Sequence, residues 1–268
     1  MRSLTDGASD RLAAAQALRT QHRSRQRFAA LSLDGQPLSP FDAYAVQALH
    51  VAELRRELAS DVAGYKIGLT SQAMQQMCGI AHPVYGCVLE CRVAHGIGKA
   101  SLADHGRLGV EFEVAARLGQ DIHLEPGDDP LARALDAVDA FAIALELVDD
   151  RHADYACIDA PSLIADNAWN AGVVLGTWTP ASHALTQSPG ELFVDGQLLD
   201  QGCIGEGAAH PLASLAWLAQ ALHEQGRFLQ RGQFVMTGSI VRTRFPDAAG
   251  PWRFALAGLG SVGLDVRL

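Results

Sequence analysis

The spacing of hydrophobic positions along the chain changes near residue 60. Before that point, residues 8–32 and the run FDAYAVQALHVAELRREL (41–58) repeat apolar residues at helical intervals, the pattern of amphipathic helices. Ser39-Pro40 stands ahead of the second run, and proline favours the first turn of a helix. We therefore expect a helical amino-terminal region over residues 1–62.

From Gly64 onward the pattern changes to short apolar runs separated by glycine, proline and acidic residues. These runs cover residues 64–69, 85–89, 109–119, 141–148, 171–178, 191–199, 234–241, 253–260 and 262–268. The Asp195-Gly196 dipeptide predicts a tight hairpin, and helices are expected at 211–224 and 129–138. The fold class predicted is α+β, with a mixed or antiparallel β domain over residues 63–268 after the helical region.

Two of these runs alternate bulky and small residues and carry acids on the small side. Glu111 and Glu113 share a face with Gly109 and Ala115, and Glu146 shares a face with the alanines that precede it in 140–146. Successive strand side chains point to opposite faces. Three such carboxylates could bind Mg²⁺, which takes oxygen ligands. The Glu-x-Glu pair is equally compatible with the solvated face of an edge strand.

The segment around Glu146 also permits a helix. Asp136, Asp139, Glu146 and Asp150 fall at helical intervals, so residues 130–150 could form one amphipathic helix with a solvated acidic side. The alternation of alanine with phenylalanine, isoleucine and leucine favours a strand for the second half of this segment.

Lys66 lies between apolar residues and between Gly64 and Gly68, which allow close backbone approach. Such a lysine is either an edge residue whose amine reaches solvent or a proton-exchanging group in a site. Burial would lower its pKa, while neighbouring carboxylates would raise it.

Composition and charge narrow the classes of function. The chain has 268 residues, a net charge of -9 and five cysteines, which argues against a nucleic-acid partner and gives no paired-cysteine framework. No apolar run reaches the ~20 residues of a membrane helix, and no secretory signal is visible. We expect a cytoplasmic protein without a membrane partner. Neither nucleotide-binding glycine motifs nor a Gly-x-Ser-x-Gly nucleophile motif occurs.

Seven segments between Asp42 and Leu268 resemble, in order, those of a known enzyme family. They read GYKIGLTS, VEFEVA, ALELVDDR, IADNAWNAGVVLG, GEGAAHPLASLAWLA, FVMTG and GLGSVGL. This set resembles the 2-keto-4-pentenoate hydratase and 4-oxalocrotonate decarboxylase branch of the fumarylacetoacetate hydrolase superfamily. The resemblance implies a mixed β-sandwich or β-roll after the helical region, a Mg²⁺ or Mn²⁺ ion, a small anionic 2-oxo acid substrate and a homo-oligomer.

The resemblance also implies roles for individual residues. Glu111 and Glu113 match the Glu-x-Glu metal pair of the family, Glu146 its third carboxylate ligand, and Lys66 its catalytic lysine. Ser71, Asp166 and Asn167 match positions that line the substrate site or support it.

One position departs from the hydratase pattern. Hydratases of this branch commonly carry Pro-Asp-(Phe/Tyr)-Gly after the lysine segment, where this chain has Val84 in Pro83-Val84-Tyr85-Gly86. Decarboxylases more often carry an apolar residue there. We expect a metal-dependent lyase acting on 2-oxo or 2-hydroxy dienoates, with hydration first and decarboxylation as the alternative. Hydrolysis of an acylpyruvate and a non-catalytic assembly protein are further alternatives.

Overall fold

The computed structural model describes residues 4–181, 185, 189–205 and 210–268. Two helices, α1 (Leu4–Arg23) and α2 (Pro40–Leu58), form the amino-terminal region. Helix α2 begins where the sequence predicts, because Ser39 caps it by accepting the N–H of Asp42 at 3.1 Å. The predicted helix over 8–32 is wrong beyond Arg23. Arg25 adopts a left-handed φ of 50°, and beyond it Phe28 packs against Trp169 from an irregular segment instead of continuing the helix.

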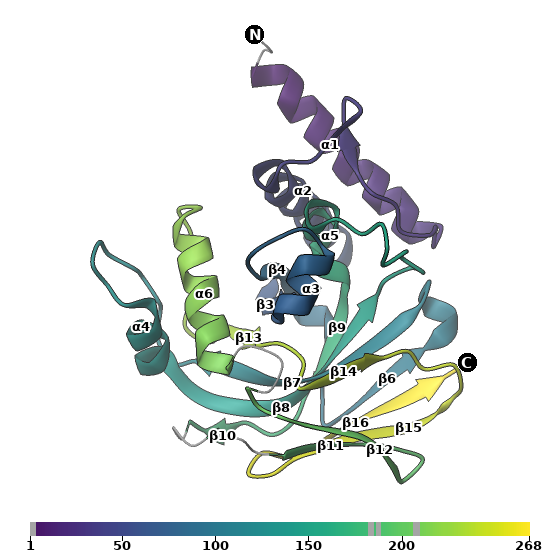
Figure 1. Cartoon of the computed structure of the whole chain (residues 1–268), viewed down its shortest axis with the longest axis vertical. Coiled ribbons are helices and arrows are strands. Elements are labelled where there is room, and N and C mark those ends of the chain that lie inside the picture. Colours follow the sequence, from purple (N-terminus) through teal and green to yellow (C-terminus); the bar gives the residue numbers. More distant parts are fainter. Residues whose placement is uncertain (1–3, 182–184, 186–188, 206–209) are drawn as a thin grey trace.

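The remaining elements alternate short helices with many strands (Figure 1). The helices are α3 (Gln72–Met77), α4 (Pro130–Ala137), α5 (Ala160–Ala165) and α6 (Pro211–His223), and 3-10 turns cover Glu90–Arg92, Leu102–Asp104 and Asn167–Trp169. The strands are β1 (Ser32–Leu33), β2 (Gln36–Pro37), β3 (Val62–Gly68), β4 (Val84–Leu89), β5 (Val93–His95), β6 (Ile97–Ser101), β7 (Leu108–Leu118), β8 (Val138–Asp149), β9 (Asn170–Leu175), β10 (Thr179–Pro180), β11 (Pro189–Val194), β12 (Gln197–Cys203), β13 (Phe234–Met236), β14 (Val241–Arg244), β15 (Gly250–Leu256) and β16 (Gly260–Arg267).

Two sheets of mixed direction make up the β domain. Within the described residues, nine strands form one sheet in the order β4-β3-β13-β7-β8-β9-β5, with β10 added to β8 and β14 to β7. Five strands form the second sheet in the order β12-β11-β15-β16-β6. Figure 1 shows the larger sheet curling, with the smaller sheet beside β8 and the helices α1 and α2 at the opposite end. The predicted α+β class with mixed sheets is confirmed.

The two faces of β7 have different roles, as its alternation predicts. Phe112 packs against Trp252 and Phe254 of the smaller sheet, with ring centroids 6.2 and 5.5 Å apart, so the bulky face is part of the core between the sheets. Glu113 and Ala115 are fully buried on the other face, inside the curl of the larger sheet.

Several sequence predictions can be compared directly with these elements. Helix α4 ends at Ala137 and β8 follows at once, so the strand interpretation of residues 138–149 is confirmed and the single helix over 130–150 is wrong. The predicted strand over 234–241 is divided by Gly238 at φ 108°. The hairpin is confirmed, because Asp195 and Gly196 have the positive φ values of a type I′ turn.

Helix α2 is bonded to the β domain through a buried amide. The side-chain N–H groups of Gln47 donate to the carbonyls of Tyr85 at 2.8 Å and Ile164 at 2.9 Å. A domain boundary near residue 62 stays a prediction. Residues 206–209, within the segment GEGAAHPLASLAWLA, lie outside the described residues.

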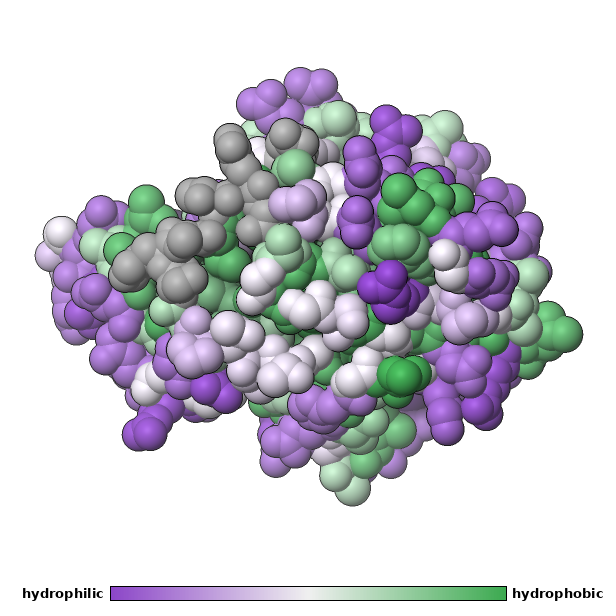
Figure 2. Space-filling model, turned by 90° about the horizontal axis from the view of Figure 1, so that it is seen from below, coloured by the Kyte–Doolittle hydropathy of each residue, from purple (hydrophilic) through white to green (hydrophobic). Residues whose placement is uncertain are grey.

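The surface carries scattered apolar side chains. The most exposed of the large ones in the described residues include Phe41 (74%) and Ile97 (72%). On the face seen from below, apolar groups lie in separate spots between polar ones (Figure 2). None of the described helices combines the length and the apolar character that crossing a membrane requires.

Candidate metal and substrate site

Three carboxylates from two neighbouring strands converge inside the curl of the larger sheet. Glu111 and Glu113 lie two residues apart on β7, and Glu111 stands directly opposite Glu146 of β8 in the antiparallel register. One carboxylate oxygen of each residue lies within 4.8 Å of the others. The alternation along β7 and the strand pairing together bring the three predicted metal ligands to one point.

Each carboxylate is held through one oxygen by a protein donor at 2.9 Å. The donors are the Thr243 hydroxyl for Glu111, the Gly238 N–H for Glu113 and the Asn170 side-chain N–H for Glu146. The second oxygens of Glu113 and Glu146 are buried and have no hydrogen-bond partner within the described residues. Buried polar atoms are normally paired, so these two oxygens fit ligation of a cation, and the oxygen-only donor set suits Mg²⁺.

The pKa shifts of these carboxylates also favour a bound cation. Burial raises the pKa of Glu113 well above its usual range, and the carboxylates of Glu146 and Glu111 raise it further. Burial likewise raises the pKa of Glu146 to about 7, against the lowering effect of Lys66. Clustered buried carboxylates need protons or a cation to offset their repulsion, and a divalent ion supplies that charge.

Lys66 of β3 is buried beside this cluster. Its ammonium Nζ lies 3.3 Å from Oε1 of Glu146 and the residue is 3% exposed, so the interpretation as a solvent-reaching edge lysine is wrong. Burial alone would lower the pKa of Lys66, but the carboxylates of Glu146, Glu111 and Glu113 outweigh it and raise that pKa. In this arrangement the three carboxylates favour the charged form of Lys66.

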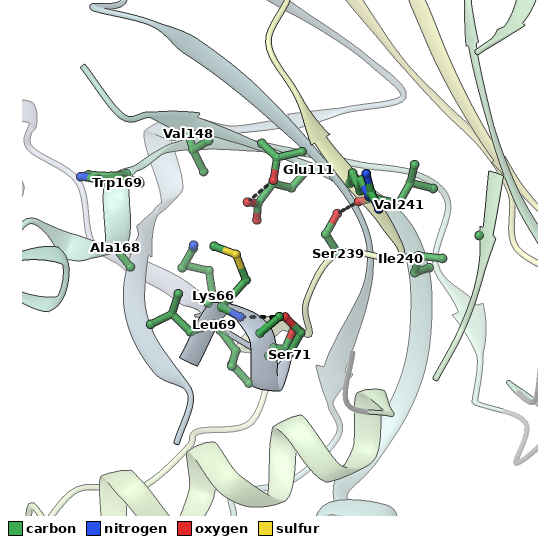
Figure 3. Close-up of a pocket in the computed structure, with 18 of the residues that line it drawn as sticks. Lys66, Leu69, Ser71, Glu111, Val148, Ala168, Trp169, Ser239, Ile240 and Val241 are labelled. Atoms are coloured by element: carbon green, nitrogen blue, oxygen red, sulfur yellow. Dashed lines mark hydrogen bonds between the residues drawn. The ribbon is translucent and has the colours of Figure 1, made fainter. Parts of the chain in front are cut away.

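A cavity of about 660 Å³ opens beside the cluster, a size typical of small-molecule sites. Lys66 and Glu111 lie in its wall, with Ser71 on another side and Ala168 and Trp169 across from Glu111 (Figure 3). The Ser71 hydroxyl also caps α3 by accepting the N–H of Met74 at 3.3 Å. The cavity therefore gives a substrate access to Lys66 and to Glu111, the outermost of the three carboxylates.

Asp166 and Asn167 do not line this cavity. The Asp166 carboxylate is buried between Arg151 Nη2 at 2.8 Å and His22 Nε2 at 2.5 Å. The Asn167 side chain accepts the N–H of Cys87 at 2.7 Å and donates to its carbonyl at 2.9 Å. Contact of Asp166 and Asn167 with a substrate therefore stays a prediction. The ion pairs and hydrogen bonds given above join both side chains to other residues of the protein.

These contacts surround an unusual turn that ends at the site. Asn167, Ala168 and Trp169 all have left-handed φ values, between 48° and 60°, a conformation that costs non-glycine residues roughly 1–2 kcal/mol each. The turn presents Ala168 and Trp169 to the cavity and leads into Asn170, which holds Glu146. The buried bonds of Asp166 and Asn167 therefore stabilise a strained segment at the cavity wall.

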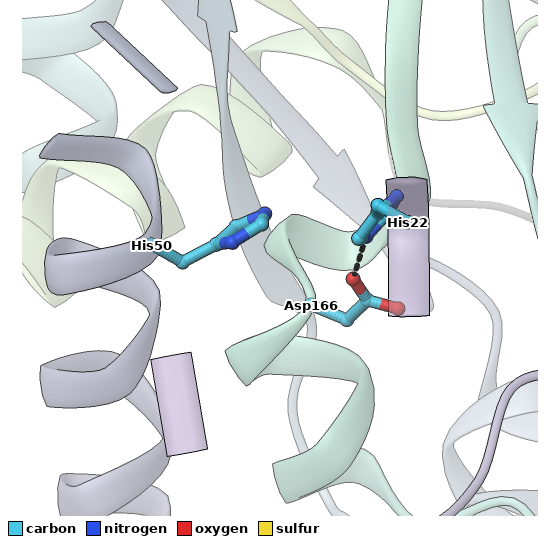
Figure 4. Close-up of side chains that lie close together, drawn as sticks. All are labelled: His22, His50 and Asp166. Atoms are coloured by element: carbon cyan, nitrogen blue, oxygen red, sulfur yellow. Dashed lines mark hydrogen bonds and ion pairs between the residues drawn. The ribbon is translucent and has the colours of Figure 1, made fainter. Parts of the chain in front are cut away.

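A second cluster has metal-ligating residue types but a different character. His22 of α1, His50 of α2 and Asp166 at the end of α5 lie close together (Figure 4). The guanidinium of Arg151 already contacts Asp166 and lies 3.0 Å from His22 Nε2. Because this cation neutralises the single carboxylate, the cluster is a buried ion-pair network between the amino-terminal helices and the sheet domain.

Val84, the departure from the hydratase pattern, lies close to Lys66. The residue is fully buried on β4. A Cβ placed on Gly68 would be 3.4 Å from the Lys66 ammonium and 3.5 Å from a Val84 methyl. Lys66 therefore has an apolar neighbour where the resemblance implies an acid in many hydratases.

Known proteins share both the sequence and the fold of this chain. No family model matches it. It is 34% identical over 227 residues to a 2-keto-4-pentenoate hydratase of Burkholderia vietnamiensis (strain G4 / LMG 22486), covering 82% of this chain and 83% of the relative. The chain belongs to the family of the 2-keto-4-pentenoate hydratases and 4-oxalocrotonate decarboxylases.

Other members of this branch carry the second activity in their names. A 4-oxalocrotonate decarboxylase of a Pseudomonas species is 29% identical over 198 residues, covering 74% of this chain and 75% of the relative. The structure of a 4-oxalocrotonate decarboxylase from Pseudomonas putida G7, complexed with magnesium and adipate, matches with a TM-score of 0.88 at 24% identity. That match covers 99% of this chain and 100% of the other and shows a shared fold.

Some site residues could not be recognised in the sequence. Thr243, Gly238 and Asn170 each hold one carboxylate, yet they come from β14, the loop before it and β9. Asn170 and Gly238 fall within the segments IADNAWNAGVVLG and FVMTG. Nothing in the sequence pairs any of the three residues with a carboxylate, because their contacts depend on which strands become neighbours in the folded sheet.

Proposed function

We propose that this enzyme is a divalent-metal-dependent lyase that adds water to the alkene of a 2-oxo or 2-hydroxy dienoate. The observation that carries the proposal is a cluster of three carboxylates, two of them with unpaired buried oxygens, beside Lys66. Glu111 and Lys66 of this group line a cavity of about 660 Å³. The hydratases among its relatives support the same activity.

Glu111, Glu113 and Glu146 would hold the metal, with Mg²⁺ preferred and Mn²⁺ as the alternative. A magnesium complex is known for a decarboxylase of the same fold. Bound there, the ion would act as a Lewis acid toward the oxygens of a 2-oxo acid, which is worth several kcal/mol of the barrier.

Lys66 is the proton carrier in this proposal. Addition of water to an alkene gives one carbon a hydroxyl and its neighbour a proton. The Lys66 ammonium lines the cavity and its pKa is raised by the three carboxylates, so it holds the proton that such a step requires. Glu146, 3.3 Å away, orients this ammonium.

Decarboxylation of a 4-oxalocrotonate-type substrate is the second candidate, and Val84 favours it. The apolar side chain beside Lys66 supplies no second acid or base to handle water on that side. Loss of CO₂ needs no water in the bond-breaking step, so an apolar neighbour is compatible with it.

Two measurements test the proposal. Glu113→Gln should abolish Mg²⁺ binding in calorimetry and turnover together, whereas Glu191→Gln at an exposed position of β11 should change neither. Product analysis with 2-hydroxypenta-2,4-dienoate and with 4-oxalocrotonate, with and without Mg²⁺, separates hydration from CO₂ release. Activity on neither substrate would favour acylpyruvate hydrolysis or a non-catalytic assembly protein instead.

Assembly and location belong to the same proposal. We expect a homo-oligomer in the cytoplasm that acts on a small anionic substrate, with neither nucleic acid nor membrane as a partner. Sedimentation of the purified chain tests the oligomeric state directly, and a monomer at micromolar concentration would contradict it.

A further inference from the structure

The indole of Trp169 lies in the cavity wall without a hydrogen bond to hold it. Trp169 lines the cavity and is 8% exposed, and its buried Nε1 has no hydrogen-bond partner in the described part of the chain. A buried indole N–H usually finds such a partner. The orientation of this ring therefore depends on the side chains that pack around it.

Two aromatic rings from other segments pack edge-on against this indole. The Phe28 ring centroid lies 5.1 Å from that of Trp169 at an interplanar angle of 87°, and the Tyr155 ring lies 6.1 Å away at 71°. Edge-to-face contacts of this kind are favourable for aromatic pairs. Tyr155 lines the cavity as Trp169 does, whereas Phe28 does not. Phe28 therefore supports the indole from outside the cavity.

The segment that carries Phe28 is bonded to the turn that follows β8. The Phe28 N–H donates to the Arg151 carbonyl at 3.0 Å, and Nε of Arg151 donates to the Gln26 carbonyl at 3.1 Å. Nε of Arg27 donates to the His152 carbonyl at 2.7 Å. The guanidinium carbon of Arg151 also lies 5.7 Å from the centre of the Phe28 ring. Residues 26–28 are thus fixed in place, and Phe28 with them.

The backbone of Trp169 needs support from its surroundings. Its φ is 60°, a left-handed conformation that is unfavourable for a residue with a Cβ and persists where the surrounding structure holds it. Figure 3 shows Trp169 on one side of the cavity and Ser239 and Val241 on the other. A displacement of the indole would therefore change the width of the cavity between these two sides.

We propose that Phe28 is a positioning residue that acts through Trp169 and limits the bulk of the substrate that the cavity accepts. The inference rests on the proposed function, in which the 2-oxo acid end lies at the carboxylates and the rest of the substrate extends into the cavity. With a smaller side chain at position 28, the indole has room to move outward and a bulkier group fits. Phe28 lies ahead of all seven segments that resemble the family.

Binding of two unreactive probes to the Mg²⁺-loaded full chain tests this role. The probes are 2-oxopentanoate and 2-oxo-5-phenylpentanoate, which share the 2-oxo acid end and differ in bulk at the other end. In calorimetry, Phe28→Leu should strengthen binding of the phenyl probe about tenfold and change that of the small probe less than about twofold. Phe28→Met, whose flexible side chain refills part of the space, should shift the ratio of the two dissociation constants in the same direction but less.

Two further variants separate positioning from a general loosening of the fold, and circular dichroism verifies that each variant is folded. Phe193→Leu removes a phenylalanine that also lies against an arginine, Arg253 at 4.1 Å, away from the cavity, and should leave the ratio unchanged. In a Trp169→Leu background, Phe28→Leu should change the ratio less than about twofold, because its effect is transmitted by the indole.

The outcomes separate this role from the proposed function. Equal changes for both probes in Phe28→Leu, or no change for either, would overturn the role of Phe28 while leaving the metal-dependent site standing. A shift of full size in the Trp169→Leu background would also overturn it, because Phe28 would then act by another route. Binding of neither probe to the native chain in the presence of Mg²⁺ would remove the proposed function and this inference together.

Discussion

Among single residues, Asn170 has the clearest supporting role. Its side-chain N–H holds Oε1 of Glu146 at 2.9 Å, which leaves Oε2 free. Asn170→Ala should therefore raise the dissociation constant for Mg²⁺ about tenfold, because ligands without a supporting hydrogen bond lose orientation. Calorimetric titration measures this. Gln201→Ala, which removes another cavity-lining amide, is the control, and an unchanged affinity in Asn170→Ala would contradict the role.

Val84 is where a single side chain is expected to direct the chemistry. Val84→Asp would place a carboxylate near the Lys66 ammonium, giving water addition a second proton-transfer group. The ratio of hydration to CO₂ release should rise about tenfold or more, measured by product analysis. Val84→Asn has the same shape without the charge and should leave the ratio near that of the native chain. A ratio that moves equally in both variants would show that shape, not charge, matters.

The three acidic residues could be predicted because a strand has a period of two. Glu111, Glu113 and Glu146 each stand on the small side of an alternating run, which the sequence displays directly. That the three carboxylates converge could not be predicted, because it depends on the register in which β7 pairs with β8. The protein-facing bonds of Asp166 and Asn167 were not foreseeable, because they depend on Arg151, His22 and Cys87 meeting them from distant segments.

At the scale of elements, the carboxyl-terminal end of α2 offers a position where a substitution should stabilise the protein. Its C-cap, Ala59, is exposed and left-handed at φ 47° and ψ 49°, a conformation in which glycine has no Cβ penalty. Ala59→Gly should increase the free energy of unfolding by about 1 kcal/mol, measured by urea titration. The same substitution at exposed Ala52 inside the helix should decrease it by about 1 kcal/mol. A loss of stability in both variants would contradict the argument.

Long elements with a strong period were predictable and short ones were not. Helices α2 and α6 and strands β7 and β8 each present many repeats of one pattern. The six-residue helices α3 and α5 have too few turns to show a period, and they are defined by the caps Ser71 and Asp159. The helical pattern of 24–32 was misleading, because Arg25 adopts a left-handed conformation and Phe28 reaches Trp169 from an irregular segment.

At the scale of the whole molecule, strand order could not be obtained from the pattern. Strand β13, at residues 234–236, inserts between β3 and β7, which lie more than a hundred residues earlier. Short runs of similar hydrophobicity do not determine which strands pair with each other in the sheet. This pairing brings Lys66 and Gly238, which both lie on the side of β7 away from β8, to the carboxylates.

The folded molecule also buries His50 of α2 at 2% exposure. Burial lowers the pKa of His50 to about 3 from an ordinary 6.5; Asp166 opposes this shift, and His22, Arg19 and Arg92 add to it. The unfolded chain binds a proton at His50 below pH 6.5, while the folded chain does so only near pH 3. Acid therefore favours the unfolded state within this window, and the full stability is present above pH 6.5.

Replacing this histidine should flatten the acid side of the stability profile. Between pH 6 and pH 4, native stability should fall by up to about 1.4 kcal/mol per pH unit more than that of His50→Gln, measured by urea titration at each pH. Other titrating groups are common to both chains, so the difference in slope isolates His50. His223→Gln, at an exposed position on α6, controls for loss of an imidazole. Parallel profiles for the native chain and His50→Gln would mean that His50 gains its proton without unfolding, and the buried network with Asp166 would then accommodate the charge.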